Sequence, residues 1–177
     1  MHVSKVKRIG IFGGSFDPPH HGHLEISKLA IKKLSLNQVY WCITKKNPLK
    51  KKAFFSLAER IKKSKSIASK VKKIKIKFFE DKINSTNTID LIKYLKKKDE
   101  KSIFFLIIGS DNLIKFHKWK NWKLLPELTE IVVFSRKDYD KKAKKSVMIK
   151  QVKKITFIKS KFINISSTQI RKKYLKT

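Results

Sequence analysis

Apolar runs and amphipathic stretches alternate along this chain. The apolar runs predict buried strands over 6–12, 38–43, 75–79, 103–108, 130–135 and 155–158. Apolar residues at helical spacing predict a helix from about residue 22, and further helices over 56–68, 88–97, 113–125 and 168–175. This alternation predicts an α/β fold, in which one doubly wound parallel sheet carries helices on both faces. We expect residues 1–177 to form a single domain of this kind.

Polar segments follow several of the predicted strands. Two of them, 44–52 and 109–112, fall at the carboxyl ends of strands, where open α/β sheets bind their ligands. Ser85 or Thr86 is the expected cap of the helix that follows. Residues 137–150 are polar and irregular, which predicts a mobile loop.

The segment 13–24, Gly-Gly-Ser-Phe-Asp-Pro-Pro-His-His-Gly-His-Leu, joins the first predicted strand to the first predicted helix. Gly13 and Gly14 lack a Cβ, so the backbone can turn sharply and a ligand can approach its N–H groups. The helix N-terminus that follows favours an anion. His20 and His23, three residues apart, can both donate to that anion when protonated. The segment therefore predicts a phosphate site.

A second motif, Ile-Ser-Ser-Thr-Gln-Ile-Arg at 165–171, lies near the other end of the chain. Ser166 and Gln169 have the spacing of a capping box, which predicts another helix N-terminus. The two motifs together resemble the signature of the nucleotidyltransferase superfamily. The resemblance implies a Rossmann-like sheet of the nucleotidyltransferase type. It also implies that an acceptor phosphate attacks the α-phosphorus of ATP in line and releases pyrophosphate.

The same resemblance assigns roles to the residues of both motifs. Those that would hold ATP are Gly13, Gly14, Ser15, Phe16, His20, His23, Ser167, Thr168 and Arg171. Those that would act in catalysis are His20, His23 and Arg171, with His23 the main candidate for stabilising the transition state. We expect Mg²⁺ as a cofactor carried by the ATP phosphates, without metal ligands from the protein, because the sequence shows no cluster of carboxylates.

The middle of the chain is similar to the bacterial nicotinate-nucleotide adenylyltransferases, so that the resemblance covers nearly the whole sequence. It is carried by the segments 44–50, 86–90 and 109–122. Asn87 and Leu91 stand where many members of that family have Tyr and Thr, and Asn-Pro-Leu-Lys replaces Pro-Pro-His-Lys within the first segment.

This second resemblance implies how the acceptor would be held. Gly109 and Asp111 would bind ribose, Trp119 would stack on the pyridine ring, and Thr88 would receive the nicotinate carboxylate. Lysines after the second strand and the arginine after the fifth could reach the phosphate. The full set of candidate mononucleotide-binding residues is Lys46, Asn47, Lys50, Thr88, Gly109, Asp111, Trp119 and Arg136. Trp122 is expected to pack against the rest of the protein.

The identity of the acceptor stays open at this point. We expect ATP and nicotinate mononucleotide, but nicotinamide mononucleotide differs only by an amide in place of a carboxylate. Phosphopantetheine ranks third, because its enzymes usually have Thr where this chain has His20, and they lack the segment from Gly109 to Trp119.

A formal net charge of +32 suggests a different class, a basic nucleic-acid-binding protein. However, the lysines recur in every segment, and only four of the 45 basic residues are arginine: Arg8, Arg60, Arg136 and Arg171. Arginine is the residue preferred for base readout and bidentate phosphate contacts. We therefore expect no specific nucleic-acid partner, and we interpret the charge as compositional drift towards Lys, Ile, Asn and Phe.

The longest apolar run, 103–108, is far shorter than the roughly 20 residues that span a bilayer. No apolar block follows the basic start, so we expect a cytoplasmic protein without a membrane partner. The single cysteine, Cys42, cannot form an internal disulfide, and we expect it to be buried in a strand. The sequence leaves the oligomeric state open.

Overall fold

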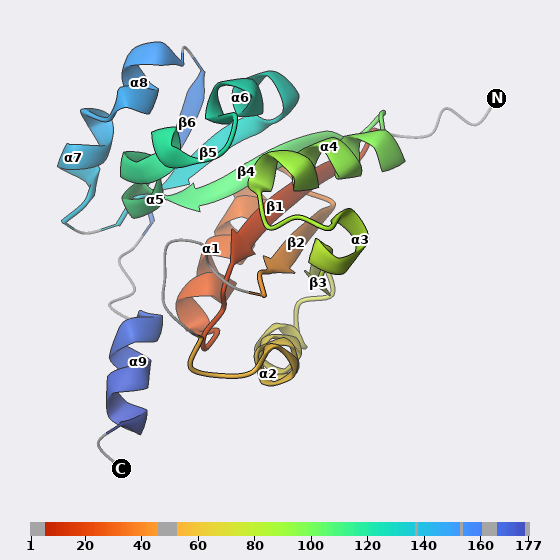
Figure 1. Cartoon of the computed structure of the whole chain (residues 1–177), viewed down its shortest axis with the longest axis vertical. Helices are drawn as coiled ribbons and strands as arrows, with labels where there is room; N and C mark the ends of the chain where they lie inside the picture. Colours follow the sequence, from red (N-terminus) through yellow and green to blue (C-terminus); the bar gives the residue numbers. More distant parts are fainter. Residues whose placement is uncertain (1–5, 46–52, 137, 153, 161–165, 176–177) are drawn as a thin grey trace.

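One parallel sheet runs through the described part of the chain, which comprises residues 6–45, 53–136, 138–152, 154–160 and 166–175 of the computed structural model (Figure 1). Its strands are β1 (Arg8–Gly14), β2 (Gln38–Ile43), β3 (Ile74–Lys77), β4 (Ile103–Gly109), β5 (Glu130–Phe134) and β6 (Ile155–Ile158). The strand order is β3-β2-β1-β4-β5-β6, and each pairing is parallel. The predicted doubly wound parallel sheet is therefore confirmed.

Helices cover both faces of this sheet. The helices of eight or more residues are α1 (His21–Lys33), α2 (Leu57–Ala68), α4 (Thr88–Lys98) and α9 (Ser167–Tyr174). The shorter ones are α3 (Glu80–Ile83), α5 (Ser110–Lys115), α6 (Leu125–Leu128), α7 (Asp140–Lys144) and α8 (Val147–Gln151). One hydrophobic cluster joins α1 and α2 to the sheet, and a second joins α4, α5, α6 and α8 to its other face. Within the described ranges, every helix is too short or too polar to cross a membrane.

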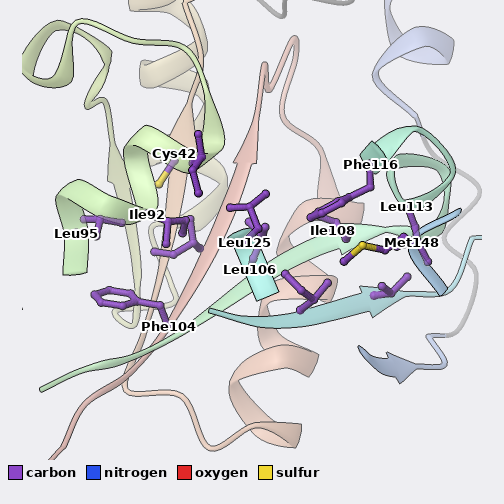
Figure 2. Close-up of a cluster of buried hydrophobic side chains, with 14 of the residues drawn as sticks. Cys42, Ile92, Leu95, Phe104, Leu106, Ile108, Leu113, Phe116, Leu125 and Met148 are labelled. Atoms are coloured by element: carbon purple, nitrogen blue, oxygen red, sulfur yellow. The ribbon is translucent and has the colours of Figure 1, made fainter. Parts of the chain in front are cut away.

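The alternation of side chains along β4 shows why this strand reads as a continuous apolar run. Phe104, Leu106 and Ile108 belong to the cluster under α4, α5 and α6 (Figure 2). Phe105 and Ile107 belong to the cluster under α1 and α2. Because both faces of β4 are buried, both sets of positions must be apolar.

The centre of the sheet contains the point where the chain reverses its direction of winding. From β1 the chain proceeds outwards through β2 to β3, and it then crosses back to β4 on the other side of β1. The β1–β2 pairing extends to Gly14, whereas the β1–β4 pairing ends at Ile11 opposite Leu106. The two central strands therefore separate at their carboxyl ends, where folds of this type bind ligands.

Most predicted elements agree with the structure to within one or two residues at each end. The strands β2 and β6 have the predicted bounds, and Cys42 is buried in β2 as expected. The predicted cap of α4 was wrong, because the N-cap residue is Asn87 and its side chain makes no capping bond. Ser85 instead accepts a hydrogen bond from the Asn87 N–H at 3.1 Å and donates one to Asp90 at 2.7 Å.

The single helix predicted over 113–125 is broken into shorter pieces. After α5, the 3₁₀ helices η1 (Phe116–Lys118) and η2 (Trp122–Leu124) precede α6. Asn121 is left-handed, with φ 48°, and Pro126 stands in the first turn of α6. A left-handed residue interrupts the helical path, and proline cannot supply the N–H that a continuous helix would need.

The loop predicted over 137–150 contains two short helices, α7 and α8. Ala143 and Met148 from these helices are fully buried in the cluster beside β4 and β5. The prediction missed them because single apolar residues are separated here by lysines, so that no helical period is visible over such short lengths. Helices α7 and α8 therefore pack against the sheet and are not part of a mobile loop.

Gly10 provides a test of this packing at the middle of β1. A Cβ there would lie 2.8 Å from Ile107 Cδ1 and 2.9 Å from Leu36 Cδ1, both in the core. We expect Gly10→Ala to lower the free energy of unfolding by about 1–2 kcal/mol, measured by urea denaturation. Gly13→Ala is the matched control, because a Cβ on Gly13 meets no atom within 4 Å. Equal stability of the two variants would contradict this account.

Candidate active site

The end of β1 leads into the segment that the sequence predicts to bind phosphate. Gly13 and Gly14 are the last residues of the strand, and neither has a positive φ. The turn expected at these glycines falls instead at Phe16, which has φ 46°. The Phe16 ring is buried and stacks on Trp41, with 5.0 Å between ring centroids. This packing stabilises the left-handed backbone conformation of Phe16. Because the ring is buried, only the backbone of Phe16 can contact a ligand.

The two histidines of the motif form a capping box at the start of α1. Nδ1 of His20 accepts a hydrogen bond from the Gly22 N–H at 3.1 Å, and Nδ1 of His23 accepts one from the His20 N–H at 3.2 Å. Their ring centroids are 3.9 Å apart. Because each Nδ1 is an acceptor, each neutral ring carries its proton on Nε2.

The surroundings of both histidines disfavour the protonated form, in which the sequence allowed them to donate to an anion. Burial, together with the positive charges of Arg136 and His21, lowers the pKa of His20 to about 4. Burial, followed by His20 and Arg136, lowers the pKa of His23 well below its ordinary value of 6.5. Each ring still has one Nε2–H with which to donate to a phosphate oxygen.

The second motif meets the first at the N-terminus of α9, which stands apart from the helices that cover the sheet (Figure 1). The predicted capping box of Ser166 is present, since its hydroxyl accepts from the Gln169 N–H at 3.2 Å. Ser167 Oγ donates to the Pro18 carbonyl at 2.9 Å, and Arg171 donates to the carbonyl of Asp17. Segments 149 residues apart in the sequence are therefore in contact.

Thr168 is held within the same group. Arg171 Nη2 donates to Thr168 Oγ1 at 3.0 Å, one turn earlier on α9. The structure thus brings together the ATP-motif residues of α9 and those of the segment between β1 and α1.

A cavity of about 430 Å³ opens beyond the carboxyl ends of β1, β2 and β4. Thr88 and Trp119, two of the expected mononucleotide-binding residues, line it together with Gly13 and Gly14. The Trp119 ring stacks on Phe116, with 4.7 Å between centroids and 29° between planes. Thr88 is the first residue of α4, whose N-cap side chain makes no capping bond. An aromatic ring and an uncapped helix N-terminus suit an aromatic anion.

Gly109, Asp111 and Arg136 form a separate group, outside the lining of that cavity. Arg136 Nη1 donates to Asp111 Oδ2 at 3.0 Å, while the buried Asp111 Oδ1 has no hydrogen-bond partner. A Cβ on Gly109 would collide with the Asp111 carboxylate, so a larger residue there would displace that side chain. Arg136 is also close enough to lower the pKa of His20 and His23. It therefore lies near the two histidines of the first motif.

Three predicted mononucleotide-binding residues, Lys46, Asn47 and Lys50, lie outside the described residues. Trp122 packs against the core, as expected, and does not line the cavity.

Sequence reasoning missed two buried charges, Asp17 and Arg60, which are 5% and 1% exposed. A signal for Arg60 was available in the sequence, because arginine is rare in this chain and is the basic residue best suited to buried, multiply bonded positions. Glu80 was also missed. Its Oε2 accepts from the Lys45 N–H at 2.8 Å, its buried Oε1 has no partner, and burial raises its pKa. Glu80 lines the cavity beside Thr88.

Among the residues that the structure describes, no group of three or more His, Cys, Asp or Glu side chains is arranged to hold a metal ion. The Asp17 carboxylate accepts backbone hydrogen bonds, and Asp111 is paired with Arg136. Metal binding through the ATP phosphates remains a prediction.

A parallel sheet that reverses between β1 and β4, with a cavity and a helix N-terminus beyond the strand ends, defines a nucleotide-binding α/β protein. The model of a family described as Cytidylyltransferase-like matches residues 11–173, and the chain belongs to this family. The resemblance to nucleotidyltransferases is thereby confirmed.

Curated relatives agree with this assignment. The chain is 49% identical over 170 residues to a probable nicotinate-nucleotide adenylyltransferase of Pelagibacter ubique (strain HTCC1062), covering 95% of this chain and 94% of that one. It is 38% identical over 128 residues to a protein of the same name from Ruegeria sp. (strain TM1040), covering 72% and 67%.

The solved structure of Plasmodium falciparum nicotinic acid mononucleotide adenylyltransferase complexed with NaAD has a similar fold. The TM-score is 0.75 at 23% identity, and the match covers 94% of this chain and 83% of that one. The fold of the whole described sheet is thus shared with that protein.

The capping histidines predict a specific pH dependence of stability. The folded-state pKa of His20, about 4, lies below the unfolded value near 6.5, so the unfolded chain binds the proton more readily between them. We expect the free energy of unfolding to be highest above pH 6.5 and to fall as the pH drops towards 4. The contribution of His20 is on the order of 3 kcal/mol.

The control is His20→Asn, because asparagine caps helices well and does not titrate. Urea denaturation between pH 4 and 8 should show a shallower decline for this variant. A decline as steep as that of the unmodified protein would contradict the role of His20.

Proposed function

We propose that this chain transfers AMP from ATP to nicotinate mononucleotide, giving nicotinate adenine dinucleotide and pyrophosphate. Its family membership and the names of its relatives support this reaction. The observation that carries the proposal is the meeting of the two motifs, Ser167 on Pro18 and Arg171 on Asp17, next to a cavity lined by Trp119. An ATP site and an acceptor site would then share the end of β1.

On the ATP side, the protein would act by positioning and by charge stabilisation. ATP would enter with Mg²⁺ bound to its phosphates. The Nε2–H groups of His20 and His23, the N-terminus of α1 and the guanidinium of Arg171 are the donors available to the triphosphate. His23 would stabilise the charge that develops on the α-phosphate in the transition state.

On the acceptor side, the pyridine ring would stack on Trp119 and its carboxylate would lie at the N-terminus of α4, near Thr88. Lys118 and Lys120 also line the cavity and favour an anion there. One observation favours nicotinamide mononucleotide as the second candidate, because the unpartnered Glu80 Oε1 could accept a hydrogen bond from an amide.

No protein nucleophile is needed for this reaction. An oxygen of the acceptor phosphate forms a bond to the α-phosphorus of ATP, while the bond from that phosphorus to the bridging oxygen of the β-phosphate breaks. Pyrophosphate leaves with the electron pair of the broken bond. Asp111 and Arg136, which form an ion pair near the histidines, would hold the ribose and phosphate of the acceptor.

Pyrophosphate release with ATP and Mg²⁺ tests the choice of acceptor. We expect kcat/KM for nicotinate mononucleotide to exceed that for nicotinamide mononucleotide by at least tenfold, and phosphopantetheine to be inactive. A carboxylate at a helix N-terminus and beside lysines supplies the physical reason. Preference for nicotinamide mononucleotide would contradict this choice and would indicate that Glu80 selects the acceptor by accepting a hydrogen bond from its amide.

His23→Asn tests the proposed transition-state donor. Asparagine keeps an acceptor at the place of Nδ1, where His23 receives the His20 N–H, but it removes the Nε2–H. We expect kcat to fall by about 10²–10³ with the KM values little changed, as for the loss of one oxyanion donor. Alanine is a poorer choice, because it also removes the acceptor of the His20 N–H. An unchanged kcat would refute this role.

A further inference from the structure

Arg60 of α2 is a buried cation whose four hydrogen bonds to described residues all go to backbone oxygens. Nη1 donates to the carbonyls of Ser15 and Thr44, both at 2.7 Å. Nη2 donates to the Lys45 carbonyl at 3.0 Å, and Nε donates to the Phe55 carbonyl at 3.1 Å. One planar guanidinium therefore ties the segment after β1, which carries the ATP motif, to the segment after β2.

Asp17 makes the complementary set of contacts from the ATP motif itself. Its carboxylate oxygens accept hydrogen bonds from the N–H groups of Phe54 and Phe55, at 2.8 and 2.9 Å. Its backbone carbonyl accepts from Arg171 of α9. The same residue thus joins the ATP motif to 54–55 on one side and to the second motif on the other.

The two charges also act on each other, since Asp17 is among the acidic groups that favour the charged form of Arg60. Burying such charges is costly, and a buried ion pair is often no more stabilising than apolar residues of similar size. Their hydrogen bonds, however, fix the relative positions of loops that lie beyond the sheet, where no strand pairing can hold them.

We propose that Asp17 and Arg60 form a positioning clamp, which sets the distance between the ATP-binding segment and residues 44–45 after β2, of which Thr44 lines the cavity. This inference rests on the proposed function. In-line transfer requires the acceptor phosphate and the α-phosphorus to be held a few ångströms apart, and about 1 Å of misplacement can cost on the order of 10²-fold in rate. Arg60 is outside the lining of the cavity and would act through the backbone of Ser15, Thr44 and Lys45.

Arg60→Lys is the variant that tests the clamp. Lysine keeps the positive charge but donates only from Nζ, so it cannot reach all the carbonyls that the Nε, Nη1 and Nη2 atoms of Arg60 contact. The matched control is Arg8→Lys. Arg8 Nε donates to the Leu34 carbonyl at 2.9 Å, its guanidinium lies 4.6 Å from the Phe105 ring centroid, and it begins β1 at the end remote from the site.

We expect Arg60→Lys to lower kcat at least tenfold, with the affinities for a non-reactive ATP analogue and for nicotinate mononucleotide, each measured alone by calorimetry, within about threefold of the unmodified protein. Arg8→Lys should lower the thermal midpoint but leave kcat within twofold. The clamp is refuted if Arg60→Lys keeps its kcat, or if its kcat falls only in proportion to substrate affinity.

Hydrogen exchange keeps the test independent of the acceptor. In the unmodified protein, the ATP analogue should slow exchange of the Phe54 and Phe55 amides, because Asp17 and Arg60 connect them to the ATP motif. In Arg60→Lys, the ATP analogue should slow exchange of these two amides less than it does in the unmodified protein. If no acceptor supports turnover, the proposed function fails, while the exchange result still decides the clamp. Equal slowing of amide exchange in the unmodified protein and in Arg60→Lys would refute the clamp.

Asp17→Asn serves as the second variant if Arg60→Lys does not fold. Its amide nitrogen cannot accept the second backbone N–H, so one of the two bonds to 54–55 is lost. The same loss of kcat and of ATP-dependent protection is expected. Retention of both would refute the clamp.

Discussion

The separation of β1 from β4 at their carboxyl ends is the constraint on which the site depends. Both strands are held in place at their amino-terminal ends, where Arg8 pairs with Ile103, and by burial on both faces. Beyond Ile11 only the pairing with β2 continues, so Gly13 and Gly14 line a cavity instead of meeting a second strand. The right-handed crossovers place helix N-termini around this opening, which explains why anion-binding groups from remote parts of the sequence converge there.

Attraction for an anion at this opening does not depend on cationic histidines. Nδ1 of His20 accepts a hydrogen bond from the Gly22 N–H, and Nδ1 of His23 accepts one from the His20 N–H. The positive charge of Arg136 also opposes protonation of both rings. Fixed dipoles and arginine supply the positive potential, and the imidazoles supply directed donors. Such an arrangement needs little reorganisation when charge moves between phosphate oxygens.

The sequence was sufficient where one physical signal dominated, and insufficient where several weak ones competed. The buried strand predicted over 103–108 and the capping box of Ser166 follow from local pattern, and both are present, the strand ending one residue later at Gly109. The break after α5 depends on a left-handed Asn121, and the helices α7 and α8 depend on two buried residues among lysines. Arg60 was missed because its partners are backbone oxygens of distant loops, which no spacing in the sequence can reveal.

The use of backbone oxygens as partners has a consequence for how this sequence can change. Arg60 binds the carbonyls of Ser15, Thr44, Lys45 and Phe55, while Ser167 and Arg171 bind those of Pro18 and Asp17. Each of these acceptors survives a side-chain substitution that leaves the backbone path intact. The identity of the donor side chains is therefore constrained, whereas a receiving position such as Lys45, whose backbone carbonyl alone takes part in this bonding, tolerates lysine. A lysine-rich composition is therefore compatible with a site held together by backbone carbonyls.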